Sequence, residues 1–212
     1  MKHLGSGAAA VLILVIIGGG LWLWWDLDLR WRPHTITKDQ AKIAGILNAS
    51  GWVSPQVAGP RLYMISYGDC AACLRFQADA FPKLRAAGIV PRVIVFARPD
   101  KNGLANSTPA ERDTVAELWV NRDWGLYERW TAATPPGSWT APGLAHADGD
   151  AARSAVIEAG RSAMKNLRPL LGSNGIRPGF PTLIWWTSAG MMRGCACEDS
   201  RSFGNVVKDL GA

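Results

Sequence analysis

The four cysteines of this 212-residue chain form two close pairs that lie far apart in the sequence. Two alanines separate Cys70 from Cys73, and one alanine separates Cys195 from Cys197. Four cysteines are too few to form the disulfide scaffold of a chain of this length. Close pairs of this kind are typical of thiol redox chemistry or of metal binding.

Cys70 stands directly after an apolar run, residues 62–67, and a tight turn at residues 68–69. We expect the run to be a buried strand and residues 70–87 to be a helix that begins at Cys70. Unpaired backbone N–H groups and the helix dipole stabilise an anion at this position. The pKa of the Cys70 thiol should therefore fall below about 8.5, although the aspartate in the turn opposes this. Cys73, one helical turn later, can close a disulfide with Cys70 or resolve a mixed disulfide.

Further apolar runs predict the strands that surround this helix. Residues 92–96 form a second buried strand, so strand, helix and strand make a βαβ unit. A third strand is predicted at residues 183–186 and an antiparallel return strand at residues 191–195, followed by a C-terminal helix. The long section at about 103–170 reads as helical and includes a capping box that begins at Thr108.

On these features the sequence resembles the thioredoxin-like superfamily. The matching features are the strand before the turn, the two-alanine cysteine motif, Pro82 and the segment 179–182. The helical section makes the chain similar to the bacterial envelope thiol–disulfide oxidoreductases of the DsbA, DsbC and DsbG group. The resemblance implies an α/β thioredoxin-like fold with a helical insertion, in which Pro181 is cis and faces the cysteines and Phe180 borders the substrate peptide. It also implies protein thiols or disulfides as substrates, a redox partner protein, and no prosthetic group.

The second cysteine pair lies at the end of the predicted return strand. Antiparallel pairing brings Cys195 and Cys197 back toward the end of the sheet where Pro181 lies, and residues two apart in a strand face the same side. Three interpretations remain open. The pair is a second redox couple that exchanges with the first, a clamp for a soft metal such as Cu(I) or Zn, or a local structural disulfide.

An uncharged apolar segment covers residues 4–25. At about 1.5 Å per residue, its 22 residues span roughly 33 Å, enough to cross the hydrocarbon core of a bilayer. Trp22, Trp24 and Trp25 crowd one end, as at a membrane interface. A cleaved signal peptide is the alternative, but these bulky residues stand where a small-residue cleavage site should be. We therefore expect an uncleaved single-pass anchor.

The remaining composition excludes several classes of function. The net charge of +6 is spread thinly, with no run of basic residues longer than two, so a nucleic-acid-binding role is not expected. Hydrophobic residues make up 48% of the chain, which excludes global disorder. The three histidines and the acidic residues show no pattern of a metal site, glycosidase or hydrolase.

Together these patterns predict an anchor at residues 1–25, a juxtamembrane linker with a short helix at residues 26–60, and a thioredoxin-like domain at residues 61–212. The expected function is a membrane-anchored thiol–disulfide oxidoreductase in which Cys70 attacks and Cys73 resolves. The flanking charges do not fix the orientation of the anchor. A dithiol/disulfide couple suits an oxidising compartment, which favours the inner membrane with the domain in the periplasm. The alternative is a structural or Cu/Zn-handling subunit of a membrane complex.

Overall fold

The computed structural model describes residues 4–27, 29–55, 58–135 and 137–212. The chain divides into two compact units, Met1–Arg32 and Pro33–Ala212.

The first unit consists of the long helix α1 (Leu4–Leu27) and the one-turn 3-10 helix η1 (Leu29–Trp31). Within the described part of the chain, Val11–Trp31 is the one stretch long and apolar enough to cross a membrane, with a mean hydropathy of 1.7. From Val11 to Trp25, its large apolar side chains are at least 50% exposed, for example 69% for Leu14. A helix that is apolar all round is unfavourable in water and suits lipid. The predicted apolar helix is confirmed and extends two residues beyond the predicted end at residue 25.

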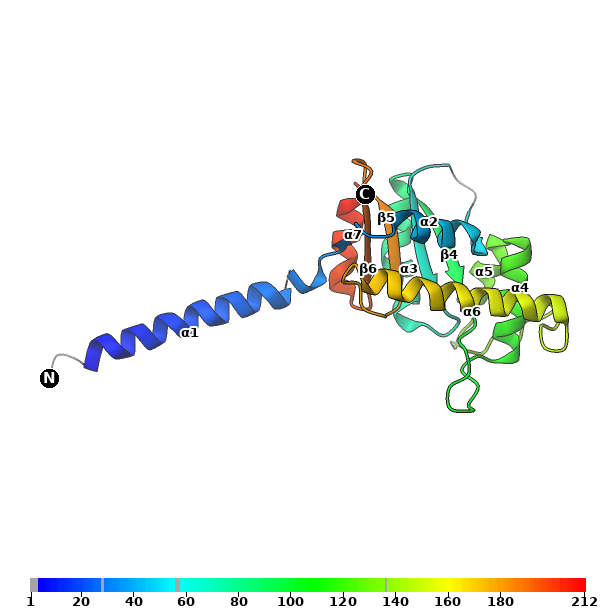
Figure 1. The fold of residues 1–212 in the computed structure, drawn as a ribbon, viewed down its shortest axis with the longest axis horizontal. Helices are drawn as coiled ribbons and strands as arrows, with labels where there is room; N and C mark the ends of the chain where they lie inside the picture. Colours follow the sequence, from blue (N-terminus) through cyan, green and yellow to red (C-terminus); the bar gives the residue numbers. More distant parts are fainter. Residues whose placement is uncertain (1–3, 28, 56–57, 136) are drawn as a thin grey trace. The chain divides into compact units, whose positions relative to one another are not determined.

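The second unit is built on one six-stranded mixed sheet with the order β1-β6-β5-β3-β4-β2. Figure 1 labels β4, β5 and β6 of this sheet. β3 pairs in parallel with β4, and every other pairing is antiparallel. The strands are β1 (His34–Thr35), β2 (Trp52–Val53), β3 (Arg61–Ser66), β4 (Val90–Val95), β5 (Thr182–Trp186) and β6 (Met192–Ala196).

The helices confirm the predicted order of elements. α3 connects the two parallel strands as the predicted βαβ unit, and three helices fill the predicted insertion between β4 and β5. The helices of this unit are α2 (Gln40–Ala49), α3 (Ala71–Ala86), α4 (Pro109–Asn121), α5 (Trp124–Thr131), α6 (Ala151–Gly172) and α7 (Phe203–Asp209), with the 3-10 helix η2 (Ser200–Ser202) before α7.

Two hydrophobic cores lie on opposite faces of the sheet, because successive strand residues point to opposite sides. Leu62 and Met64 of β3 belong to the core shared with α3 and α7, whereas Tyr63 and Ile65 belong to the core shared with α2 and α6. All four side chains are at most 1% exposed. Strands covered on both faces read as continuous apolar runs, which is why these strands could be predicted from the sequence.

The predicted linker at residues 26–60 is wrong in its extent. The second unit already begins at Pro33, and β1 and β2 form the two edges of its sheet. The short helix is present as α2, and its Ile43 and Leu47 are fully buried. Strands of two residues are too short to show an alternating pattern, so β1 and β2 could not be recognised in a segment that contains glycines, serines and prolines.

Candidate functional site

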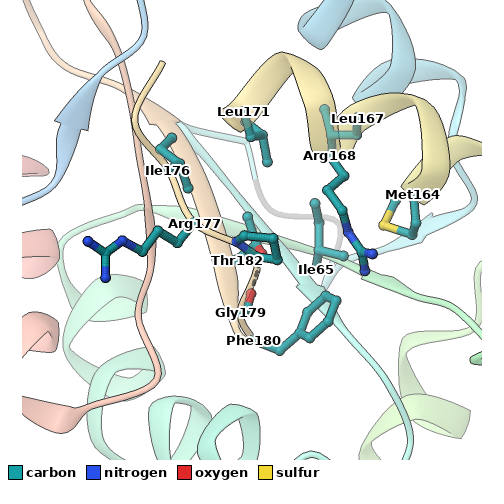
Figure 2. A pocket seen from close by; sticks show the side chains of 11 residues that line it. Ile65, Met164, Leu167, Arg168, Leu171, Ile176, Arg177, Gly179, Phe180 and Thr182 are labelled. Carbon is teal, nitrogen blue, oxygen red and sulfur yellow. Dashed lines mark hydrogen bonds between the residues drawn. The ribbon is translucent and has the colours of Figure 1, made fainter. Parts of the chain in front are cut away.

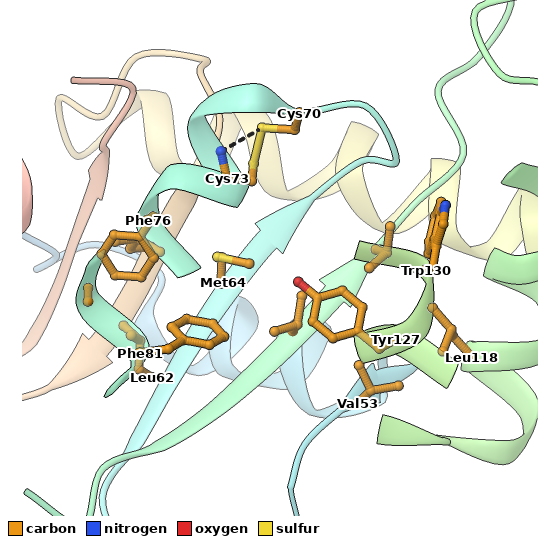
Figure 3. Close-up of a cluster of buried hydrophobic side chains, with 14 of the residues drawn as sticks. Val53, Leu62, Met64, Cys70, Cys73, Phe76, Phe81, Leu118, Tyr127 and Trp130 are labelled. Atoms are coloured by element: carbon orange, nitrogen blue, oxygen red, sulfur yellow. Dashed lines mark hydrogen bonds between the residues drawn. A yellow bond between two sulfur atoms is a disulfide. The ribbon is translucent and has the colours of Figure 1, made fainter. Parts of the chain in front are cut away.

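Cys70 and Cys73 form a disulfide at the start of α3, with 5.2 Å between their Cα atoms. Cys70 is the N-cap of the helix, and its sulfur accepts a hydrogen bond from the backbone N–H of Cys73 at 3.2 Å (Figure 3). The backbone N–H of Cys70 donates to the carbonyl of Tyr67 at 3.2 Å and closes the turn that follows β3. The predicted placement of the motif at a strand-to-helix turn is therefore confirmed.

The disulfide is buried at the edge of the first hydrophobic core. Cys70 is 2% exposed and Cys73 is 1% exposed. Met64 of β3 and Phe76 of α3 belong to the same cluster (Figure 3). These neighbours carry no charge, so groups of the backbone and of the adjoining turn dominate the electrostatics around the sulfurs.

A charged pair stands beside this turn. The Asp69 carboxylate accepts a hydrogen bond from the Arg98 guanidinium at 2.7 Å, and the guanidinium carbon lies 4.2 Å from the centroid of the Tyr67 ring. Asp69 was expected to oppose the lowering of the Cys70 pKa. Because its carboxylate is paired with a guanidinium cation, its effect on the Cys70 pKa is weaker. Both side chains are partly exposed, so solvent screens this effect.

Glu111 is a site residue that the sequence analysis missed. Its side chain is 7% exposed and accepts a hydrogen bond from the backbone N–H of Gly68, two residues before Cys70, at 3.1 Å. Burial raises the pKa of the Glu111 carboxyl above its ordinary value, and the Gly68 hydrogen bond partly offsets this. The predicted capping box places Glu111 correctly, because Thr108 Oγ1 accepts its N–H at 3.0 Å. The sequence contained no signal that its carboxyl group meets a turn 43 residues away.

An open hollow lies beside the same turn. Gly68, Asp69 and Glu111 contribute to its wall, together with two tryptophans of the insertion, Trp130 and Trp139. Trp130 is 9% exposed and belongs to the first core, so its ring also packs against the interior of the domain. The hollow offers aromatic and carboxylate groups next to the disulfide.

The peptide bond between Phe180 and Pro181 is cis, as predicted. Pro181 is buried and directly precedes β5, while Phe180 is half-buried. The Phe180 ring meets the Tyr67 ring edge-on with 5.3 Å between the centroids. Tyr67 also accepts the Cys70 hydrogen bond, so the structure brings the cis-proline loop and the cysteine turn together.

The fold is thioredoxin-like. The cysteine motif at the start of the helix of a βαβ unit, the cis-proline before β5, the antiparallel β5–β6 hairpin and the terminal helix all occur in one domain.

A second, smaller hollow in the thioredoxin-like domain borders the cis-proline loop, since Gly179, Phe180 and Thr182 contribute to its wall. Figure 2 shows Phe180, Ile65 and Met164 around it, with the long side chains of Arg168 and Arg177 at its border. Its wall is mainly apolar.

The second cysteine pair is also a disulfide, with 5.3 Å between the Cα atoms of Cys195 and Cys197. Cys195 is in β6 opposite Leu183, and the backbone N–H of Cys197 donates to the carbonyl of Pro181 at 2.8 Å. Both cysteines belong to the same hydrophobic core as the first pair. The predicted return of this pair to the cis-proline is confirmed.

The metal-clamp interpretation of this pair stays a prediction, and it requires a reduced pair because cysteine binds metal as a thiolate. Among the described residues, no group of three or more His, Cys, Asp or Glu side chains could hold a metal ion.

Comparison with known proteins yields distant structural similarities. No protein-family model and no curated protein matches the chain. A linker-deletion mutant of ScsC from Proteus mirabilis is 14% identical, with 99% of this chain and 96% of that chain covered and a TM-score of 0.42. DsbA from Chlamydia trachomatis is 14% identical, with 76% of this chain and 91% of that chain covered and a TM-score of 0.35.

Proposed function

We propose that the chain is a membrane-anchored thiol–disulfide oxidoreductase that exchanges disulfides with cysteines of protein substrates. One observation carries this proposal: the Cys70–Cys73 disulfide begins a helix beside a cis-proline loop. The backbone N–H of Cys73 donates a hydrogen bond to the Cys70 sulfur, and this bond would also stabilise a Cys70 thiolate when the disulfide opens. Cys70 is therefore the better leaving group and the attacking residue of the pair.

In the oxidising direction, a substrate thiolate attacks Cys70 Sγ. The Cys70–Cys73 bond breaks, and Cys73 leaves as a thiolate and takes up a proton. A second substrate thiolate then attacks the substrate sulfur of the mixed disulfide and releases the Cys70 thiolate. Two electrons pass from the substrate dithiol to the cysteine pair, which ends as a dithiol. The reverse sequence reduces a substrate disulfide.

Phe180 and Pro181 are proposed to bind the peptide segment that carries the reacting cysteine. Phe180 contacts Tyr67 of the cysteine turn and also Phe96 at the end of β4, with 5.4 Å between the ring centroids. The mainly apolar hollow beside the loop, and the aromatic and carboxylate groups of the hollow beside the cysteine turn, suit an extended peptide of mixed sequence.

The apolar helix α1 is proposed to span the inner membrane once and to hold the domain in the periplasm. An oxidising compartment is needed for a pair that cycles through a disulfide. A redox partner protein must restore the starting oxidation state after each turnover, because a single couple carries only two electrons.

Trapping of a mixed disulfide tests this proposal. Full-length protein with Cys73→Ser in detergent, first reduced and freed of reductant and then incubated with a disulfide-bonded model protein, should accumulate an adduct at Cys70. The matched variant Cys70→Ser should form none and should lose exchange activity. Equal adducts with both variants, or full activity of Cys70→Ser, would overturn the proposed function.

A further inference from the structure

The disulfide between Cys195 and Cys197 closes a very short loop, because its two cysteines are separated by only 2 positions in the sequence, against 3 for Cys70–Cys73. A disulfide stabilises a fold mainly by restricting the unfolded chain, and the effect grows with the length of the closed loop. This bond joins the end of β6 to the next residue but one and connects no two elements. Structural stabilisation is therefore a weak explanation for two cysteines at this position.

The second pair is buried to about the same extent as the first. Cys195 is 5% exposed and Cys197 is 0% exposed, against 2% for Cys70 and 1% for Cys73. Thiol–disulfide exchange needs a thiolate to approach the sulfur along the S–S bond, so access limits the reaction. A thiol that already lies in the same core does not have to cross the protein surface to reach this bond.

The first pair meets this condition. All four cysteines belong to one buried cluster. A short series of contacts also joins the two pairs through the cis-proline loop: Cys197 donates its N–H to Pro181, and the adjacent Phe180 packs on Tyr67. Tyr67 in turn accepts the N–H of Cys70. The two disulfides thus lie at the same end of the sheet, on the same face.

We propose that Cys195–Cys197 is an internal redox couple that exchanges electrons with Cys70–Cys73, which extends the proposed function and rests on it. When the first pair is reduced, one of its thiolates attacks Cys197 Sγ, and Cys195 leaves as a thiolate. The other thiol of the first pair loses its proton and attacks the first-pair sulfur of the mixed disulfide, releasing the Cys197 thiolate.

The reaction is balanced within the chain. The first pair ends as a disulfide and the second as a dithiol, two electrons have moved, and the two protons lost by the first pair match the two gained by the second. The chain can therefore take electrons from two substrate dithiols before it meets its redox partner.

Pair-resolved alkylation tests the exchange in the full-length oxidised protein in detergent, with an excess of a reduced model protein as electron donor. In the wild type, mass spectrometry should find both pairs reduced, Cys70–Cys73 first. With Cys70→Ala and Cys73→Ala combined, reduction of the second pair should be at least about tenfold slower, since no thiol in the core can reach it.

The outcomes separate the two proposals. Two results would overturn the internal exchange alone. In one, the second pair is reduced as fast in the double variant as in the wild type. In the other, the Cys195–Cys197 disulfide persists in wild-type protein whose first pair is reduced. Failure of the model protein to reduce the first pair would overturn the proposed function.

A crosslinking experiment gives an independent measurement. Variants that keep one cysteine of each pair, Cys73→Ser with Cys195→Ser and Cys70→Ser with Cys195→Ser, are oxidised and mapped by mass spectrometry. At least one should form an intramolecular bond to Cys197 as its main product. Absence of that bond in both folded variants contradicts the exchange.

Discussion

Replacing Glu111 with glutamine should change how the stability of the domain depends on pH. The pKa of the Glu111 carboxyl is raised in the folded state, from an ordinary value of 4.5, because the group is buried. Below that ordinary value the carboxyl is protonated in both states. As the pH rises from there through the folded-state pKa, the unfolded chain releases this proton first, and the wild type loses stability.

Glutamine keeps an oxygen that can accept the Gly68 N–H but does not titrate. The stability of Glu111→Gln relative to the wild type should therefore increase as the pH rises from the ordinary value of 4.5 through the folded-state pKa, by about 1.4 kcal/mol for each tenfold difference in proton affinity between the folded and unfolded states. Glu111→Ala is the matched control. It loses the hydrogen bond to Gly68, about 0.5–1.5 kcal/mol, and one buried methylene at about 0.8 kcal/mol, so it should be destabilised by about 1–2 kcal/mol even at low pH.

Urea unfolding of the full-length protein in detergent, followed by tryptophan fluorescence across this pH range, measures both variants. The chain contains 11 tryptophans, which gives a strong signal. A difference between Glu111→Gln and the wild type that stays constant with pH, or that falls as the pH rises, would refute the reasoning.

Three further predictions concern packing, a buried acid and the anchor. Gly51→Ala should lower the urea midpoint by the equivalent of about 1–3 kcal/mol, because the new Cβ would lie 2.3 Å from Trp119 Cγ; an unchanged midpoint contradicts the packing. Asp113→Ala should destabilise the domain by about 1–3 kcal/mol, because the buried carboxylate accepts the Ala147 N–H at 2.6 Å; wild-type stability would refute this. Full-length protein should stay with membranes in alkaline carbonate extraction, whereas residues 33–212 should be released; extraction of the full-length chain would exclude a spanning helix.

The central strands and the cysteine turn were predictable because their information is local. Residues 62–67 are a buried apolar run, and the tight turn and cysteine motif follow at once. Thr108 has the sequence of a helix cap and is one. The cis-proline came from the resemblance to a known superfamily, and the structure agrees.

The missed features depend on contacts between distant parts of the chain. β1 pairs His34 with Gly194, so this two-residue edge strand has no pattern of its own and exists only because β6 is present. Glu111 is near the cysteine turn only because α4 packs there. Burial decides its chemistry, and a single sequence does not show which carboxylates tertiary packing will bury.

The reaction of the reduced full-length protein with a small disulfide probe, followed in a single turnover as a function of pH, tests the central claim most directly. The account predicts that the first mixed disulfide forms at Cys70 with an apparent pKa below about 8.5. Cys73 should then displace the probe and leave the Cys70–Cys73 disulfide. A first adduct at Cys73, or an apparent Cys70 pKa at or above about 8.5, would contradict it.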